Sequence, residues 1–210
     1  LKKYGPEKVY QGGLRVYTTF DPKAQNAFDK AVRDTLDQKF PITKDKPYVQ
    51  TAAVLIEAKT GYVRAIVGGR SYEVERGINR AVAPYLRQPG STIKPLVVYS
   101  PALETEDHNP RITPGTVFDD APFDNKWRDP DTGQPGTWPE NWNKTFAGLI
   151  TVRDALKDSV NVVAVRVMQQ IGVDRGIDYA KRFGLPVVEK GASNDRNLAL
   201  ALGGMTKGVS

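Results

Sequence analysis

Apolar residues recur every three or four positions along residues 22–39, which predicts an amphipathic helix. Asp21 and Pro22 stand where a capping residue and a first helical residue belong. Upstream, alternation of β-favouring residues predicts a short strand at Leu14, Val16, Thr18 and Phe20. Residues 41–48 contain two prolines and several polar residues, so they are typical of a linker. A domain boundary is therefore expected near residue 48.

A strongly β-favouring block follows. Residues 51–57 and 62–67 flank Ala58-Lys-Thr-Gly61, whose glycine can adopt the positive φ that a tight turn needs, so the pattern predicts a hairpin. Gly68 and Gly69 end it. From Ser91 to Leu103 the spacing predicts a helix, and Pro95 is acceptable there because it lies in the first turn.

The second half of the chain combines a long irregular stretch with three predicted helices. Residues 106–143 are acidic, with a net charge of −5, and rich in Pro, Gly and Trp without periodicity. A loop of this length is typically a functional cover or a flexible segment, and its tryptophans (Trp127, Trp138 and Trp142) could anchor it. Helices are predicted at 151–157, 162–171 and 174–183 from their capping residues and glycine stops.

Composition narrows the classes of function. The 210 residues are 40% apolar and 26% charged, as in an ordinary soluble domain, which excludes a disordered or collagen-like chain. The net charge of +6 includes no run of more than two adjacent basic residues, so no nucleic-acid partner is expected. The chain begins without Met, a signal peptide or a membrane-spanning run, and we expect it to be a piece of a larger protein.

Residue types also limit the chemistry. No cysteine is present, which excludes a thiol nucleophile and a cysteine-ligated zinc. The single histidine, His108, lies in a polar loop sequence and excludes a His-rich metal site. We therefore expect no metal or cofactor, and catalysis by Ser, Lys, Asp, Glu or Tyr.

The spacing of Ser91 and Lys94 is typical of a serine nucleophile with a lysine base. In Ser91-Thr-Ile-Lys94, residues three apart share a helix face, so the lysine can reach the serine hydroxyl. A lysine whose pKa is lowered by burial can take the proton of such a nucleophile. About one Ser-x-x-Lys is expected by chance in a chain of this length, and the alternative is a capping serine beside a solvated lysine. Pro89 and Gly90 favour the first interpretation, because they place Ser91 at an exposed helix start.

A second pair, Ser159-Val-Asn161, falls at the junction between two predicted helices. Its hydroxyl and amide could both face a cleft. The alternative is that both residues cap a helix–helix turn, which Ser and Asn favour.

Together these segments resemble the transpeptidase domain of class A penicillin-binding proteins, with its Ser-x-x-Lys and Ser-x-Asn motifs. The resemblance rests on Arg87-Gln-Pro-Gly-Ser-Thr-Ile-Lys-Pro95 after the Gly68-Gly69 hairpin, and on Asp158-Ser-Val-Asn-Val162. Three further segments are similar to the family: Gly12-Gly-Leu-Arg-Val-Tyr-Thr-Thr-Phe-Asp-Pro22, Ile112-Thr-Pro-Gly-Thr-Val-Phe-Asp-Asp120 and Leu198-Ala-Leu-Ala-Leu-Gly-Gly204. The likeness covers nearly the whole chain.

The resemblance implies an α/β (α+β) fold of the penicillin-binding transpeptidase or serine β-lactamase type, an antiparallel sheet with helices that is incomplete in this chain. Residues 1–48 would be an interdomain linker segment and 49–210 the N-terminal part of the transpeptidase domain. The family's Lys-Thr-Gly motif follows Ser-x-Asn, whereas Lys59-Thr-Gly61 precedes Ser91, so we interpret it as a hairpin turn. We expect the strand that carries the motif to lie outside this chain, and the fragment to be inactive without it.

The resemblance further implies a serine D-Ala-D-Ala transpeptidase that cross-links peptidoglycan stem peptides and is acylated by β-lactams. Ser91 would be the nucleophile, Lys94 its proton acceptor, Ser159 a proton shuttle, and Asn161 a support for Lys94 and the substrate amide. The implied partners are the remainder of the domain and the glycosyltransferase domain of a membrane-anchored parent, on the extracytoplasmic face of the bacterial plasma membrane. A serine β-lactamase, a non-enzymatic β-lactam sensor and a binding module are the alternatives.

Overall fold

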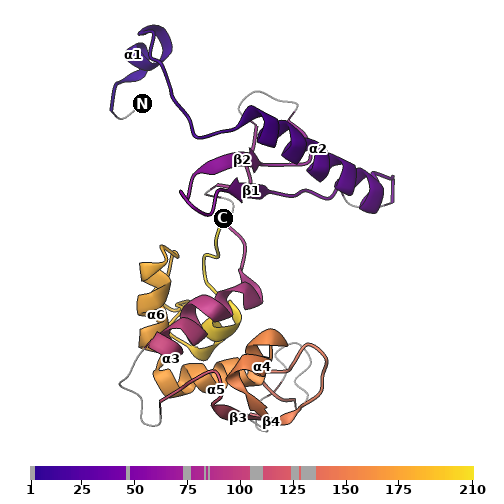
Figure 1. Ribbon diagram of the computed structural model, residues 1–210, viewed down its shortest axis with the longest axis vertical. Coiled ribbons are helices and arrows are strands. Elements are labelled where there is room, and N and C mark those ends of the chain that lie inside the picture. Colours follow the sequence, from indigo (N-terminus) through magenta and orange to yellow (C-terminus); the bar gives the residue numbers. More distant parts are fainter. Residues whose placement is uncertain are drawn as a thin grey trace. The chain divides into compact units, whose positions relative to one another are not determined.

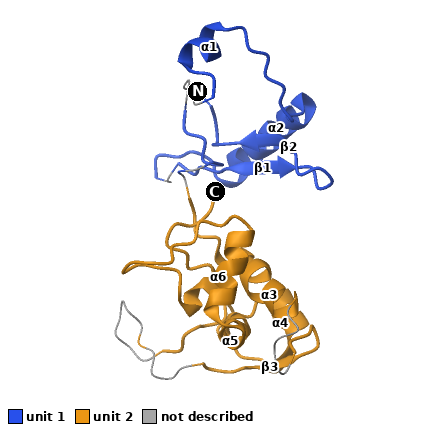
Figure 2. Cartoon of the chain, turned by 90° about the vertical axis from the view of Figure 1, so that its left-hand side faces the viewer, with its two compact units in different colours: residues 1–85 blue, residues 86–210 orange. Residues whose placement is uncertain are grey.

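The computed structural model describes residues 3–45, 48–72, 77–82, 84, 86–104, 111–123, 128 and 136–210. The chain forms two compact units, Leu1–Tyr85 and Leu86–Ser210, coloured separately in Figure 2. This division comes from contacts within the chain, whereas the division expected near residue 48 rests on the linker-like residues 41–48 and on the family resemblance, and stays a prediction. In the described part, no helix is both long enough and apolar enough to cross a membrane.

The first unit contains the predicted helix and the predicted hairpin. Helix α2 spans Pro22–Lys39, and the Asp21 carboxylate accepts hydrogen bonds from the amides of Lys23 (2.8 Å) and Ala24 (3.2 Å) at its start. Strands β1 (Ala53–Ile56) and β2 (Val63–Val67) pair antiparallel, and Gly61 adopts a φ of +71° in the turn between them. The interpretation of Lys59-Thr-Gly61 as a turn is thus confirmed. A short helix, α1 (Pro6–Gln11), was not predicted.

The outer edge of β2 is covered by the segment that leads into α2. The Gln25 side chain donates to the Ile66 carbonyl (3.0 Å) and accepts from the Ile66 amide (2.9 Å), as a neighbouring strand would. The Asp21 amide donates to Arg64 O (2.9 Å) and Thr19 Oγ1 donates to Val63 O (2.8 Å). Because these groups occupy β2, the outer edge of β1 is the open edge of this hairpin among the described residues.

The predicted strand at 14–20 is wrong. This segment is not a strand and pairs with no strand of the described residues, and its Val16 and Tyr17 are 80% and 87% exposed. Alternation predicts a strand only where a neighbouring strand and a covering layer exist. Here single hydrogen bonds to β2 replace the ladder.

The second unit is built mainly from helices. Its elements are η1 (Gly90–Ile93), η2 (Pro95–Tyr99), α3 (Ser100–Glu104), β3 (Val117–Asp120), β4 (Gly148–Thr151), α4 (Val152–Lys157), α5 (Asn161–Ile171), α6 (Val173–Arg182) and η3 (Leu198–Leu202). Figure 1 shows α5 beside the η2–α3 run, and both contribute to one apolar core. Helix α5 is apolar on nearly all sides, as a central helix must be. The predicted helices at 151–157, 162–171 and 174–183 are confirmed within one residue at each end.

The predicted helix from Ser91 is helical but irregular. It begins as a 3₁₀ turn, η1, continues as a π-helical turn, η2, and becomes an α-helix only at Ser100. Pro95 explains the change, because it has no amide to donate to the Ser91 carbonyl four residues earlier. That carbonyl accepts from the Lys94 amide instead, and the Pro95 carbonyl accepts from Ser100.

The long segment 106–143 contains a strand that its sequence did not predict. Strand β3 pairs antiparallel with β4, in register from Val117 with Thr151 to Asp120 with Gly148. Trp138 packs against the core, whereas the Trp142 side chain is 76% exposed. His108 and Trp127 lie outside the described residues.

Candidate active site

Lys94 is the buried centre of the candidate site. Only 1% of its surface is exposed, and its ammonium donates to Asn161 Oδ1 (2.6 Å), Ser159 O (2.7 Å) and Ser159 Oγ (3.2 Å). All three acceptors are neutral, and no carboxylate of the described residues forms an ion pair with Lys94. Burial without a counter-charge lowers the pKa of Lys94 to about 8.

Ser159 and Asn161 reach Lys94 from the junction between α4 and α5. Ser159 has a φ of +53°, a left-handed conformation that few non-glycine residues adopt. In this conformation the chain reverses direction between the two helices, and both the carbonyl and the hydroxyl of Ser159 contact Lys94. Such strain persists only where the surroundings hold it, and it is typical of functional sites.

Ser91 lies at the exposed start of the same helical run, three residues before Lys94. We expected Ser91 Oγ within hydrogen-bond reach of Lys94 Nζ, but no hydrogen bond joins these two described side chains. The reason is that the Lys94 ammonium donates to its three acceptors on the Ser159–Asn161 side. The structure therefore brings Lys94, Ser159 and Asn161 together and leaves the Ser91 hydroxyl without a bond to them.

The backbone before Ser91 is held by the end of the chain. Gly203, with a φ of +82°, lies so close to Gly90 that a Cβ atom there would stand 2.3–2.5 Å from Gly90 backbone atoms. Arg87 and Val209 exchange two backbone hydrogen bonds of 2.7 Å. Only glycine permits this approach at residue 203.

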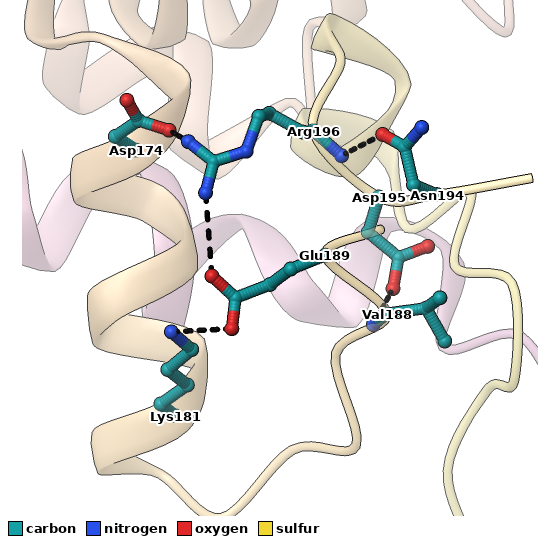
Figure 3. Close-up of polar contacts among 7 residues, drawn as sticks. All are labelled: Asp174, Lys181, Val188, Glu189, Asn194, Asp195 and Arg196. Carbon is teal, nitrogen blue, oxygen red and sulfur yellow. Dashed lines mark hydrogen bonds and ion pairs between the residues drawn. The ribbon is translucent and has the colours of Figure 1, made fainter. Parts of the chain in front are cut away.

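A polar cluster holds the segment that carries Gly203 (Figure 3). The fully buried Asp195 accepts from the Val188 amide (2.7 Å), as Figure 3 shows. It also accepts from the Thr206 amide (2.7 Å) and the Thr206 hydroxyl (2.7 Å). Next to it, Arg196 forms ion pairs with Asp174 of α6 and with Glu189. Since Thr206 follows Gly203 closely, these contacts also position the backbone opposite Gly90.

Sequence reasoning missed two residues behind the site, Asp120 and Asn141. Both are buried polar side chains, 2% and 5% exposed, in a stretch interpreted as an irregular loop. The only sequence signal was the two short polar residues themselves, since nothing local shows that they are buried. A cavity of about 500 Å³ adjoins them and is lined by both, together with Trp142, Lys157 and Ser159.

No group of three or more His, Cys, Asp or Glu side chains is placed to hold a metal ion, as far as the described residues go. The side chains gathered around Lys94 offer a serine hydroxyl, an amine and an amide. These groups are suited to acyl transfer through a serine ester.

The model of the penicillin-binding protein transpeptidase domain matches residues 51–197, which include both Ser91-Thr-Ile-Lys94 and Ser159-Val-Asn161. The chain belongs to this family. It is 35% identical to penicillin-binding protein 1A of Clostridium botulinum over 99% of its length, and 34% identical to penicillin-binding protein 1F of Bacillus subtilis over 97%. It spans 25% of each of these relatives.

Solved structures agree on the fold. The crystal structure of penicillin-binding protein 1A from Haemophilus influenzae matches 76% of this chain with a TM-score of 0.60 and 33% identity, over 21% of its own length. The transpeptidase domain of penicillin-binding protein 3 from Burkholderia pseudomallei covers 90% of this chain, and 53% of that domain is matched, with a TM-score of 0.59 and 22% identity. The predicted α/β transpeptidase fold is thereby confirmed.

Proposed function

We propose that the protein containing this chain is a peptidoglycan D,D-transpeptidase that works through an acyl ester of Ser91. The observation that carries the proposal is the buried Lys94, which lies one helical turn after Ser91. Its ammonium donates hydrogen bonds to Ser159 and Asn161. Family membership supplies the class of reaction. The four residues Ser91, Lys94, Ser159 and Asn161 are its proposed catalytic set.

In the first step, Ser91 Oγ attacks the carbonyl carbon of the D-Ala-D-Ala bond, and neutral Lys94 takes the hydroxyl proton. The C–N bond breaks, and the terminal D-Ala leaves with a proton delivered through Ser159. In the second step, an amine of a neighbouring stem peptide attacks the ester carbonyl and the C–O bond to Ser91 breaks. The proton that the amine loses passes through Lys94 to Ser91 Oγ, which restores the hydroxyl. The Ser91 amide would donate to the developing oxyanion.

Lys94 suits the role of proton acceptor because of its burial. A lysine with a pKa of about 8 is neutral in about one molecule in ten at pH 7, whereas an unperturbed lysine is almost fully charged. When neutral, the amine gains a lone pair and can turn toward Ser91. The three hydrogen bonds that it donates in this structure fit the protonated resting form.

The wider context of the reaction is also part of the proposal. A β-lactam would acylate Ser91, and the substrate would be peptidoglycan stem peptides at the extracytoplasmic face of a bacterial plasma membrane. The rest of the transpeptidase domain would supply the Lys-Thr-Gly strand, and a glycosyltransferase domain would belong to the same parent protein. We expect residues 1–210 alone to be inactive, because this strand completes the site in the family.

Labelling with a fluorescent penicillin tests the proposal in the full-length protein. We expect the wild type to be labelled and Ser91→Ala to be unlabelled, because the proposed nucleophile is then gone and the neighbouring Thr92 hydroxyl is bonded to Pro89 O (2.7 Å). Ser193→Ala, which removes an exposed serine far along the chain, is the matched control and should be labelled normally. Equal labelling of Ser91→Ala and the wild type would overturn the assignment of the nucleophile.

Product analysis separates the transpeptidase from the other acylating proteins. The protein is incubated with a stem peptide ending in D-Ala-D-Ala and with an amine acceptor. A transpeptidase forms the new amide, a β-lactamase hydrolyses penicillin without forming it, and a sensor is acylated by penicillin but turns over neither substrate. Absence of the amide product would reject transpeptidation.

A further inference from the structure

Asn141 uses its whole amide group behind the candidate site. Its Oδ1 accepts from the backbone amides of Asn161 (2.9 Å) and Val162 (3.3 Å). Its Nδ2 donates to Asp120 Oδ1 (2.8 Å) and to Thr145 O (2.9 Å). A buried side chain with all its hydrogen bonds made holds a single orientation.

These bonds replace a missing local cap on α5. The residue before the helix is Val160, whose side chain cannot accept a hydrogen bond from the first free amides. Asn141, twenty residues earlier in the chain, supplies that acceptor. Its orientation is set by Asp120 on β3, whose second carboxylate oxygen accepts from the Ala147 amide (2.8 Å).

The same segment also orients the side chain of Asn161. Glu140 O accepts from Asn161 Nδ2 (2.6 Å), which leaves Asn161 Oδ1 facing Lys94 at 2.6 Å. Backbone and side chain of Asn161 are thus both held by residues 140–141. The carboxylates closest to this arrangement in the chain, Asp120, Glu140 and Asp158, form no hydrogen bond or ion pair with Lys94.

We propose that Asn141 and Asp120 are a positioning pair that fixes Asn161, and through it Lys94, for acylation of Ser91. Neither residue touches the reacting atoms, so their role is indirect. The inference rests on the proposed function. A small displacement of a reacting group can lower a rate by about 100-fold, so loosening Asn161 should lower the acylation rate substantially.

The test compares four variants of the full-length protein in their rate of acylation by a fluorescent penicillin. Asn141→Ala removes the pair, and we expect a loss of about 10- to 100-fold. Asn141→Asp keeps an acceptor for the α5 amides but opposes the Asp120 carboxylate, so a similar loss is expected. The swap, Asp120→Asn with Asn141→Asp, restores one donor facing one carboxylate but loses the bond to Thr145 O, so it should recover part of the rate.

Thr151→Ala is the matched control for lost helix stability. Thr151 Oγ1 caps α4 by accepting from the Asp154 amide (3.1 Å), and its side-chain bonds run to Asp154 rather than to α5. We expect this variant to unfold at a lower urea concentration than the wild type but to be acylated normally. An equal loss of rate in Thr151→Ala, or a swap no faster than Asn141→Asp, would overturn the proposal.

A second measurement separates failure of this inference from failure of the proposed function. NMR of ¹³C-labelled lysine, assigned with Lys94→Gln, gives the pKa of Lys94 in each variant. In Asn141→Ala the released Asn161 would no longer hold its Oδ1 against the Lys94 ammonium, which should lower that pKa, and the swap should restore it. An unlabelled wild type would refute the proposed function alone, whereas an unchanged Lys94 pKa in Asn141→Ala would refute the positioning role.

Discussion

Raising the pH through the range in which Lys94 loses its proton should raise the rate at which Ser91 is acylated. The expectation follows from the burial of Lys94, which lowers its pKa to about 8. Only the neutral amine can take the proton of the Ser91 hydroxyl. The rate of acylation should therefore follow the neutral fraction of Lys94.

The size of the effect can be worked from the same value. At pH 7 a lysine with a pKa of about 8 is about 10% neutral, whereas one at the ordinary value of 10.5 is about 0.03% neutral. Burial thus raises the neutral fraction of Lys94 at pH 7 about 300-fold, which corresponds to a free-energy difference of about 3 kcal/mol. We expect the rate to rise about tenfold per pH unit up to pH 7 and to level off above about 8.

The assay is stopped-flow acylation of the full-length protein by a fluorescent penicillin between pH 6 and 10. Lys94→Arg keeps the positive charge but cannot lose a proton in this range, so its rate should fall by several orders of magnitude and lose the rise with pH. Lys190→Arg, the same change at an exposed position, is the control. A wild-type rate that is flat from pH 6 to 9, or a Lys94→Arg variant with normal acylation, would refute the reasoning.

Two further predictions concern the backbone of the site. Ser159→Gly should be about 1 kcal/mol more stable than Ser159→Ala in urea unfolding, because glycine adopts the positive φ without strain and both variants lose the hydroxyl. Equal stabilities would show that Ser159 is not strained. Gly203→Ala should lower the free energy of unfolding by at least about 2 kcal/mol and slow acylation, because its Cβ would meet the Gly90 backbone. Gly115→Ala, at an exposed position where the nearest atom is 3.9 Å away, is the control, and comparable effects in both variants would reject the close approach.

Much of the secondary structure was determined by the sequence alone, because its signals are local. The cap at Asp21, the proline after it and the apolar spacing together specified α2, and the β-favouring runs around Gly61 specified the first hairpin. The same reasoning located α4, α5 and α6. It also identified both motifs of the site and their family, since each motif is a short pattern that can be recognised from consecutive residues alone.

The tertiary structure decided which segments pair with one another. Alternation at 14–20 predicted a strand that does not form, because none of the strands that the structure describes pairs with it. Strand β3 was not predicted, because it is formed by pairing with β4, which begins nearly thirty residues later in the chain. Both outcomes depend on contacts that are remote in sequence, which local patterns do not encode.

The site shows the same division most clearly. Sequence named Ser91, Lys94, Ser159 and Asn161, but the burial of Lys94 and its bonds to residues 65 and 67 positions away exist only in the folded unit. Asn141 had no distinguishing pattern at all, because an asparagine in a polar loop is usually solvated. Its role arises where β3, the loop and α5 meet, and a buried amide there must satisfy every donor and acceptor.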